Sequence, residues 1–300
     1  RSVSAFLLNR SSDLAIVYLF SLAGLVTSKC DCCDQCGQEQ EAEVEHLSGS
    51  CPEIKYVSGG YSGSGFASRY WDCCKPSCSW TSNAGAGNEA RQCDSSMNLI
   101  SDTNAASKCD GGPSTTCLSQ IPFTIDGCDE LGFAFAAVPG NGPSVCGRCF
   151  LLEFTGTGKY ETKTNHRKLK GKKLIVMASN IGYDVAGGQF DVMIPGGGVG
   201  IFNGCADILG WNMGAQYGGL LSDCENSVGY GGSDDEIYKK RKECLTDKCN
   251  SVFSGKSHAK EGCLFLANFL EAAGNPLHNF KEVDENDIAW CNSNWASNCR

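Results

Sequence analysis

Hydrophobic positions along most of the chain form short runs that alternate with clusters of Gly, Ser, Asn and Asp. Three of these runs have the composition of β-strands, because they are rich in branched and aromatic residues and bounded by turn residues: 150–154, 173–179 and 190–196. A fourth run, 132–138, is too short to settle its period and fits either a strand or a helix.

One stretch, 263–273, has the pattern of a helix, and Gly274 is a natural stop for it. With 37 Gly in 300 residues and no Gly-X-Y period, the chain is expected to contain many tight turns and close backbone contacts. Many short strands with sparse helix predict an all-β dominated fold, a small β-barrel with long loops and a few short helices.

The N-terminal segment predicts export from the cell. Residues 14–26 form an uncharged apolar run of thirteen residues, shorter than the roughly 20 residues of a membrane-spanning helix but suited to the apolar part of a signal peptide. Residues 1–28 are therefore predicted to be a signal peptide, with a buried helix or strand as the alternative. No later run is long and apolar enough to cross a bilayer, so we expect a secreted, extracellular protein without a membrane partner in its mature form.

Cysteine is abundant, with 21 residues, and so many thiols indicate an oxidising compartment and disulfides. Residues 29–65 combine a Cys-rich acidic segment with a Gly/Ser-rich run, 58–65, that is typical of a flexible linker. The spacing of Cys33 and Cys36 is half of a zinc site, but a matching second pair is missing nearby, so a disulfide-tied appendage is the preferred interpretation. The folded domain is predicted to span 66–300.

The formal net charge of −9 disfavours binding to a phosphate backbone, which needs clustered Lys and Arg. One segment is strongly basic although the chain as a whole is acidic. It has six basic residues within eleven positions: Lys163, Arg167, Lys168, Lys170, Lys172 and Lys173. It lies between two predicted strands and lacks interleaved aromatic residues, so a solvated hairpin loop is expected in place of a nucleic-acid site. A neutral partner fits the composition best.

Most motifs of metal, cofactor and serine-nucleophile enzymes are missing. The four His residues form no His-x-x-x-His pair, and no G-x-S-x-G occurs. Residues 196–204 contain G-x-G but lack the third Gly and the βαβ context of a dinucleotide site, so backbone crowding at a barrel turn is the preferred explanation. No cofactor and no metal are expected, and carboxylates remain as the candidate catalytic groups.

Three carboxylates lie outside the polar runs. Asp72 precedes two adjacent cysteines that would fix its backbone, and Asp191 lies at the start of an apolar strand, where burial raises a carboxyl pKa. Asp184 stands seven residues earlier, in a loop that contains Gly. Two carboxylates in contrasting surroundings can take opposite acid and base roles, although a structural Asp at a strand start is the simpler alternative.

Longer motifs surround these carboxylates: SRYWDCCKPSCSW at 68–80, QFDVMIPGGGVGIFNGC at 189–205 and QYGGL at 216–220. In this order and separation they resemble the family 45 glycoside hydrolases, the small secreted endoglucanases, over roughly residues 66–280. The resemblance implies a six-stranded double-psi β-barrel, a fold that the family shares with expansins. It also implies hydrolysis of β-1,4-glucosidic bonds with inversion at the anomeric carbon.

The resemblance also assigns roles. Asp72 matches the family's general base and Asp191 its general acid, so their carboxyl groups should lie about 6.5–9.5 Å apart to leave room for the attacking water. Asp184 matches the acidic residue of a loop that closes over the substrate, and Tyr70 matches a tyrosine beside the base. Assisting or substrate-binding roles follow for three more residues of the first motif: Ser68, Arg69 and Trp80.

Trp80, and also Trp71, can offer a flat face to a glucose ring, unless either side chain fills the barrel. Gln189 stands where some members of the family have His next to the acid. Residues 229–260 receive no interpretation from the sequence.

The resemblance implies four disulfides: Cys73–Cys205, Cys74–Cys109, Cys78–Cys146 and Cys93–Cys117. Five later cysteines have no partner from the sequence: Cys128, Cys244, Cys249, Cys291 and Cys299. Sixteen of the 21 cysteines lie from Cys73 onward, an even number that could all pair in disulfides. The five cysteines from Cys30 to Cys51 would then form a separate group, with one of them unpaired within it.

The sequence therefore predicts a secreted, monomeric endo-β-1,4-glucanase, a cellulase that acts on a neutral β-1,4-glucan. The alternative is an expansin-like protein that binds and loosens cell-wall polysaccharides without hydrolysis. Expansins lack a counterpart of the base, so the presence of Asp72 favours the enzyme. A disulfide-rich inhibitor would account for the cysteines but not for the two carboxylate motifs.

Overall fold

The computed structural model describes residues 51–139 and 145–284, so the predicted signal peptide and the Cys-rich segment before Cys51 lie outside the described residues. Within them the strands are β1 (Ser62–Tyr70), β2 (Phe123–Thr124), β3 (Leu131–Pro139), β4 (Cys149–Gly158), β5 (Lys173–Gly182), β6 (Phe190–Met193) and β7 (Pro276–Glu282). The α-helices are α1 (Thr81–Ala84), α2 (Thr164–Lys168), α3 (Gly219–Val228), α4 (Asp234–Val252) and α5 (Ser257–Asn268). Two short 3-10 helices, η1 (Ser77–Ser79) and η2 (Lys108–Asp110), lie in the long loop after β1.

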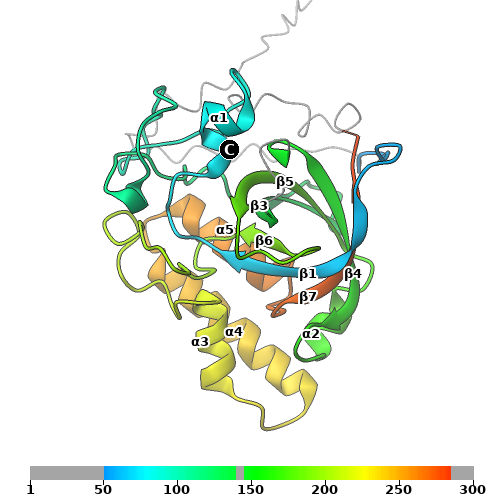
Figure 1. The fold of residues 1–300 in the computed structure, drawn as a ribbon. Coiled ribbons are helices and arrows are strands. Elements are labelled where there is room, and N and C mark those ends of the chain that lie inside the picture. The colour runs from blue at the N-terminus through cyan, green and yellow to red at the C-terminus, as the bar shows by residue number, and fades with distance from the viewer. Residues whose placement is uncertain (1–50, 140–144, 285–300) are drawn as a thin grey trace, which may run out of the picture. The chain divides into compact units, whose positions relative to one another are not determined.

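Six of the strands form a closed barrel (Figure 1). Neighbours follow the order β3, β5, β4, β7, β1, β6, and a pairing between β3 and β6 closes the ring. β1 runs parallel to β6 and β3 runs parallel to β5, whereas the remaining barrel pairs are antiparallel. The six-stranded barrel is confirmed, and the run 132–138, left open between strand and helix, belongs to β3.

The core of the barrel consists of apolar side chains from all of its strands. β3 is buried along almost its whole length, as expected for a strand that is covered on both faces. In the interior, Phe190 of β6 packs against Phe150 of β4 and Phe280 of β7, with ring centroids 5.3 Å apart in both pairs. Since β6 has only four residues, these contacts hold it in place.

The helices are more extensive than the sequence predicted. Residues 229–260, which had no interpretation, contain the whole of α4, a helix of 19 residues. Ser233 and Glu236 form a capping box at its start, and Asp234 and Asp235 add negative charge to its first turn. The predicted helix 263–273 is shifted, because α5 already begins at Ser257 and ends at Asn268.

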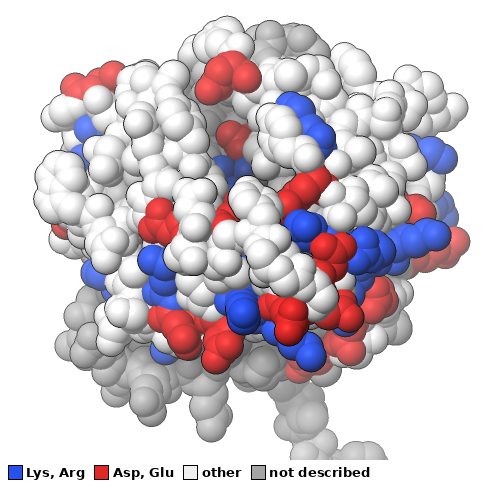
Figure 2. Space-filling model, turned by 90° about the horizontal axis from the view of Figure 1, so that it is seen from below, with Lys and Arg blue, Asp and Glu red and all other residues white. Residues whose placement is uncertain are grey.

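The basic cluster is not a solvated loop throughout. Part of it forms α2, which lies beside α4, and Lys163 and Arg167 both pair with Asp234 at the start of α4. Lys172 pairs with Glu271. Three of its six basic residues therefore have acidic partners. Figure 2 shows Lys and Arg interspersed with Asp and Glu on the face of the molecule that is seen from below.

The Gly/Ser-rich run is not a linker throughout either, because β1 begins within it, at Ser62. A Cβ on Gly65 would lie 1.9 Å from the carbonyl oxygen of Gly188, so only glycine allows the loop before β6 to lie this close to β1. The glycines that predicted flexibility here permit a close backbone contact instead.

Seven disulfides join pairs of cysteines within the described residues. All four that the resemblance implied are present. The other three are Cys51–Cys128, Cys224–Cys244 and Cys249–Cys263. The Cys51–Cys128 disulfide shows that one prediction was wrong: the cysteines before and after Cys73 do not pair as separate groups, because Cys51 is bonded to the loop before β3. Among the residues that the structure describes, no helix is long and apolar enough to cross a membrane.

Candidate active site

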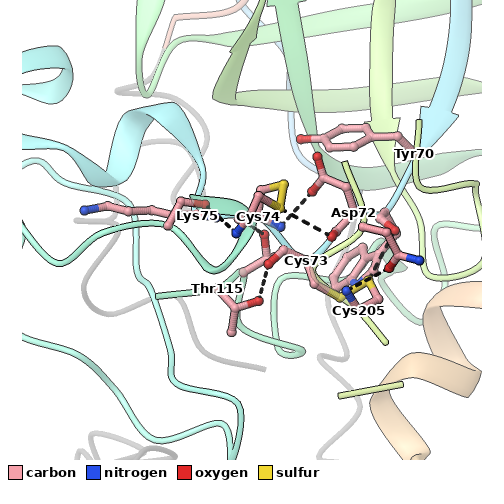
Figure 3. The surroundings of a disulfide bond; sticks show 12 residues. Tyr70, Asp72, Cys73, Cys74, Lys75, Thr115 and Cys205 are labelled. Atoms are coloured by element: carbon pink, nitrogen blue, oxygen red, sulfur yellow. Dashed lines mark hydrogen bonds between the residues drawn. A yellow bond between two sulfur atoms is a disulfide. The ribbon is translucent and has the colours of Figure 1, made fainter. Parts of the chain in front are cut away.

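Asp72 lies two residues beyond the end of β1, where the chain leaves the barrel. The next residue, Cys73, has a φ of 57°, a left-handed conformation that is unfavourable for a residue with a Cβ. Three interactions hold this turn: the Cys73–Cys205 and Cys74–Cys109 disulfides and a hydrogen bond from Thr115 Oγ1 to the Cys73 carbonyl. Figure 3 shows the Asp72 side chain directly above this cluster. The two disulfides therefore fix the backbone next to Asp72, as the sequence predicted.

Asp72 is partly buried, and one of its carboxyl oxygens has a hydrogen-bond donor. The backbone N–H of Cys74 donates to Asp72 Oδ1 at 2.9 Å, which favours the ionised form. Burial dominates, and together with the charge of Asp191 it raises the pKa of Asp72 to about 6.

Asp191 lies in β6, between β1 and β3, and its register partner in β1 is Ser68. Its Oδ1 is buried without a hydrogen-bond partner, which favours the protonated form. Burial raises the pKa of Asp191 to about 6; the Ser68 hydroxyl and the charge of Arg69 act to lower it, and the charge of Asp184 acts to raise it. The structure therefore brings all three carboxylates of the sequence analysis together.

Asp184 is exposed, in the loop between β5 and β6. The loop after β6, residues 196–204, contacts the end of β1. A Cβ on Gly197 would lie 2.9 Å from the backbone nitrogen of Tyr70. The carbonyl oxygen of Gly198 accepts a hydrogen bond from the N–H of Trp71 at 2.8 Å. Backbone crowding thus explains this Gly-rich stretch, as the sequence predicted.

Tyr70 lies beside Asp72, with its ring above the carboxyl group in Figure 3. Burial, followed by the charge of Asp72, raises the pKa of Tyr70 well above its usual value, so the phenol is neutral. Asn180 of β5 was missed by the sequence analysis: its Nδ2 donates to the Tyr70 hydroxyl at 3.0 Å, while its Oδ1 accepts from the N–H of Ser77 at 2.8 Å. The Tyr70 oxygen accepts, so its proton is left for another partner in the site.

Arg69 does not lie where a substrate could reach it. Its side chain is buried, with Nε donating to the Gly218 carbonyl at 3.1 Å and Nη2 donating to Ser222 Oγ at 3.3 Å. Burial lowers the pKa of Arg69, and the charges of Glu225 and Asp191 oppose this. The expected substrate-binding role is corrected: Arg69 is buried, interacts with the charge of Asp191 and links β1 to α3.

The two tryptophans of the first motif are in different environments. Trp71 is 1% exposed and fills the interior, so it offers no face to a sugar. Trp80 is partly exposed, and Lys75 Nζ lies 3.3 Å from the centroid of its ring. Lys75 also donates to the carbonyl oxygens of Thr103 and Ala105, so the cation holds the indole in a fixed orientation.

Several exposed aromatic side chains that the sequence analysis did not select lie in the loops that carry or adjoin the site. Tyr183, next to Asp184, is 96% exposed, and Trp211 is 81% exposed in the loop after Cys205. Across 51–139 and 145–284, no group of three or more His, Cys, Asp or Glu side chains is placed to hold a metal ion.

Residues 64–230 match the family described as glycosyl hydrolase family 45. The chain is 41% identical over 226 residues to endoglucanase B of Cellvibrio japonicus (strain Ueda107), a match that covers 73% of this chain and 43% of that protein. It is 43% identical over 236 residues to an endoglucanase of Cryptopygus antarcticus, which covers 77% of this chain and 88% of that protein.

The match to a putative endoglucanase type K of Fusarium oxysporum likewise spans only 50% of that protein, so the chain covers half or less of two of these relatives. The crystal structure of a cellulase from the Antarctic springtail Cryptopygus antarcticus aligns with a TM-score of 0.56 and 34% identity, over 74% of this chain and 91% of that one. On the extent of these matches, the chain belongs to glycosyl hydrolase family 45.

Proposed function

We propose that this protein is an endo-β-1,4-glucanase that hydrolyses internal bonds of cellulose or a related β-glucan with inversion. One observation carries the proposal: two partly buried carboxyl groups, of which Asp191 raises the pKa of Asp72 through its charge, have contrasting hydrogen bonds. Asp72 has a backbone donor that stabilises the carboxylate, and Asp191 has a buried oxygen without any partner. This contrast suits a base and an acid respectively.

In the proposed reaction, the Asp72 carboxylate takes a proton from a water molecule as the water oxygen bonds to the anomeric carbon. Asp191 gives its proton to the glycosidic oxygen as the bond from that oxygen to the anomeric carbon breaks. The water attacks from the face opposite the leaving group, so the configuration inverts. Asp72 ends protonated and Asp191 ionised, and exchange with solvent restores both.

The surrounding residues support this assignment. Asp184, exposed on a neighbouring loop, raises the pKa of Asp191 through its charge and so keeps the acid protonated. The neutral Tyr70 phenol has a free proton to donate to Asp72 or to the attacking water. Trp80, held by Lys75, offers one face on which a glucose ring can stack.

The remaining expectations stay part of the proposal. The printed names of the relatives, endoglucanase and cellulase, support a neutral β-1,4-glucan as substrate. The disulfides support an extracellular location, because they persist in oxidising compartments. A secreted monomer that needs no metal or cofactor, binds no nucleic acid and has no membrane partner is the form in which we propose that it acts.

Replacement of either carboxylate tests the proposal. Asp72→Asn and Asp191→Asn should each lower the rate of hydrolysis of soluble carboxymethyl-cellulose by roughly 10²–10⁴-fold, because each removes one proton transfer. Asp129→Asn, at an exposed carboxylate before β3, is the matched control and should leave the rate unchanged. Retained activity of Asp72→Asn would exclude the base assignment, and an inactive wild-type protein that still binds cellulose would favour the expansin-like alternative.

A further inference from the structure

We propose that Asn180 is a positioning residue that turns the Tyr70 hydroxyl proton toward the water molecule activated by Asp72. The inference rests on the proposed function, because it takes Asp72 as the base. Asn180 lies near the end of β5 and is half-buried. Its side chain contacts the chain on both sides of Asp72, at Tyr70 and at Ser77.

Two hydrogen bonds fix the orientation of the Asn180 amide. Its Oδ1 accepts from the backbone N–H of Ser77 at 2.8 Å, and a backbone N–H can only donate. Nδ2 therefore faces the other way, where it lies 3.0 Å from the Tyr70 hydroxyl oxygen. Because an amide nitrogen can only donate, the Tyr70 oxygen must accept in this contact.

Both ends of this bridge have firm support. Asn180 belongs to a barrel strand, where its register partner in β3 is Ala137. Ser77 begins η1, and the next residue, Cys78, is joined to Cys146 by a disulfide. The amide thus links the two ends of the segment 70–77, which carries Asp72, to a rigid part of the barrel.

Tyr70 and Asp72 lie on the same face of the chain. Trp71, between them, is buried in the interior, whereas Tyr70 and Asp72 are both partly exposed. Side chains two positions apart in an extended chain point to the same side, so the alternation places the phenol next to the carboxyl group. Figure 3 shows this arrangement, with the Tyr70 ring above the Asp72 carboxyl group.

No described residue accepts the Tyr70 proton. Within 51–139 and 145–284, the Tyr70 hydroxyl makes one hydrogen bond, the contact in which it accepts from Asn180. A phenol has a single proton, which is then available to a ligand in the site. Since one oxygen of Asp72 already accepts from the Cys74 N–H, the other oxygen is left for the water. That water therefore has a donor, Tyr70, beside its acceptor.

A water molecule between these two groups is oriented by both. It donates one proton to the Asp72 carboxylate and accepts a hydrogen bond from Tyr70, which leaves its second lone pair for the anomeric carbon. Reversal of the Asn180–Tyr70 hydrogen bond would leave the water held by Asp72 alone. Misplacement of a reacting group by about 1 Å can lower a rate by about 100-fold, so kcat should fall. KM should change little, because the water is not part of the sugar.

Asn180→Asp tests the direction of this hydrogen bond. One carboxylate oxygen still accepts from the Ser77 N–H, but the other accepts where Nδ2 donated, so the Tyr70 proton turns away from the water. We expect kcat on cellohexaose, at the pH optimum of the variant, to fall by about 10–100-fold, with KM changed by less than about twofold. Asn279→Asp, at an exposed asparagine of β7, is the matched control and should leave kcat unchanged.

Tyr70→Phe separates positioning from structural support. It keeps the ring but has no proton to direct, so it should lower kcat by a similar factor. Asn180→Asp added to Tyr70→Phe should lower kcat no further, because Asn180 acts on the water only through the Tyr70 hydroxyl. Asn180→Ala, which removes the donor without adding a charge, should lower kcat in the wild-type protein but not in Tyr70→Phe.

Unchanged kcat in Asn180→Asp, or losses that multiply in the double variant, would overturn the positioning role. An equal loss for Asn180→Ala with and without the Tyr70 hydroxyl would also overturn it, because the contact with Ser77 would then be what matters. Asp72→Asn, assayed alongside, separates this from the proposed function. If Asp72→Asn is inactive while Asn180→Asp keeps full activity, only the role of Asn180 fails. If Asp72→Asn retains activity, the base assignment fails and this role with it.

Discussion

At the scale of single residues, the site places two carboxyl groups where charge is costly. The burial of the Asp191 carboxyl oxygen has a consequence for stability. Its folded pKa of about 6 lies above its ordinary value of 3.8, so between these values the folded state binds the proton more tightly than the unfolded state does. The free energy of unfolding therefore falls as the pH rises from about 4 to about 6.

Asp191→Asn removes the buried charge and should be more stable than the wild-type protein at pH 7. We expect a gain of about 1–3 kcal/mol in the free energy of unfolding at pH 7 and almost none at pH 4, where the wild-type carboxyl is already neutral. Denaturant unfolding with intact disulfides, followed by tryptophan fluorescence at both pH values, measures the difference. An equal effect at pH 4 and pH 7 would mean that the pKa of Asp191 is the same in the folded and the unfolded protein, which would contradict the effect of burial.

At the scale of elements, the site depends on how closely the loop before β6 lies against β1. Gly65→Ala places a Cβ against the Gly188 carbonyl and should displace the loop that carries Asp184 and Gln189. We expect a loss of about 1–3 kcal/mol in the free energy of unfolding together with reduced kcat. Gly187→Ala, where nothing lies within 4 Å of the added Cβ, is the matched control and should be tolerated. Equal behaviour of the two variants would contradict the close contact.

The disulfides divide into those that support the site and those that support the helices. Removal of Cys73–Cys205, whose ends are 132 positions apart in the sequence, should cost about 4–5 kcal/mol by chain entropy. It should also misplace Asp72, so kcat should fall by about 100-fold or more. Removal of Cys249–Cys263, between α4 and α5, should cost about 3 kcal/mol with little effect on kcat. Paired alanine variants assayed well below their melting temperatures would show this. A similar fall of kcat in both would indicate that the first disulfide has no specific role in holding Asp72.

At the scale of the whole molecule, the sequence predicted the barrel and the carboxylates but not their supports. The two carboxylates could be found because each lies in a long motif of the family. Arg69 was misassigned, because a charged residue inside such a motif looks accessible until the structure shows it buried against α3. Asn180 was missed, since an asparagine at the end of an apolar strand carries no signal until Tyr70 is beside it.

The helical layer was underestimated for a different reason. α4 is rich in charged residues and has few apolar ones, so its periodicity is weak in the sequence. Its stability comes from a good cap, from ion pairs with Lys163 and with Arg167 of α2, and from the two disulfides that tie it to α3 and α5. The partner of Cys51 could not be predicted either, because connectivity does not follow from counting cysteines.

The configuration of the first product tests the central assignment most directly. Proton NMR of cellohexaose during its first turnovers with the wild-type protein should show the α-anomer at the new reducing end, later decaying by mutarotation, because water activated by Asp72 attacks from the face opposite the leaving group. The β-anomer as the first product would require a covalent intermediate and a nucleophilic carboxylate. That result would contradict Asp72 as the base and Asp191 as its partner acid.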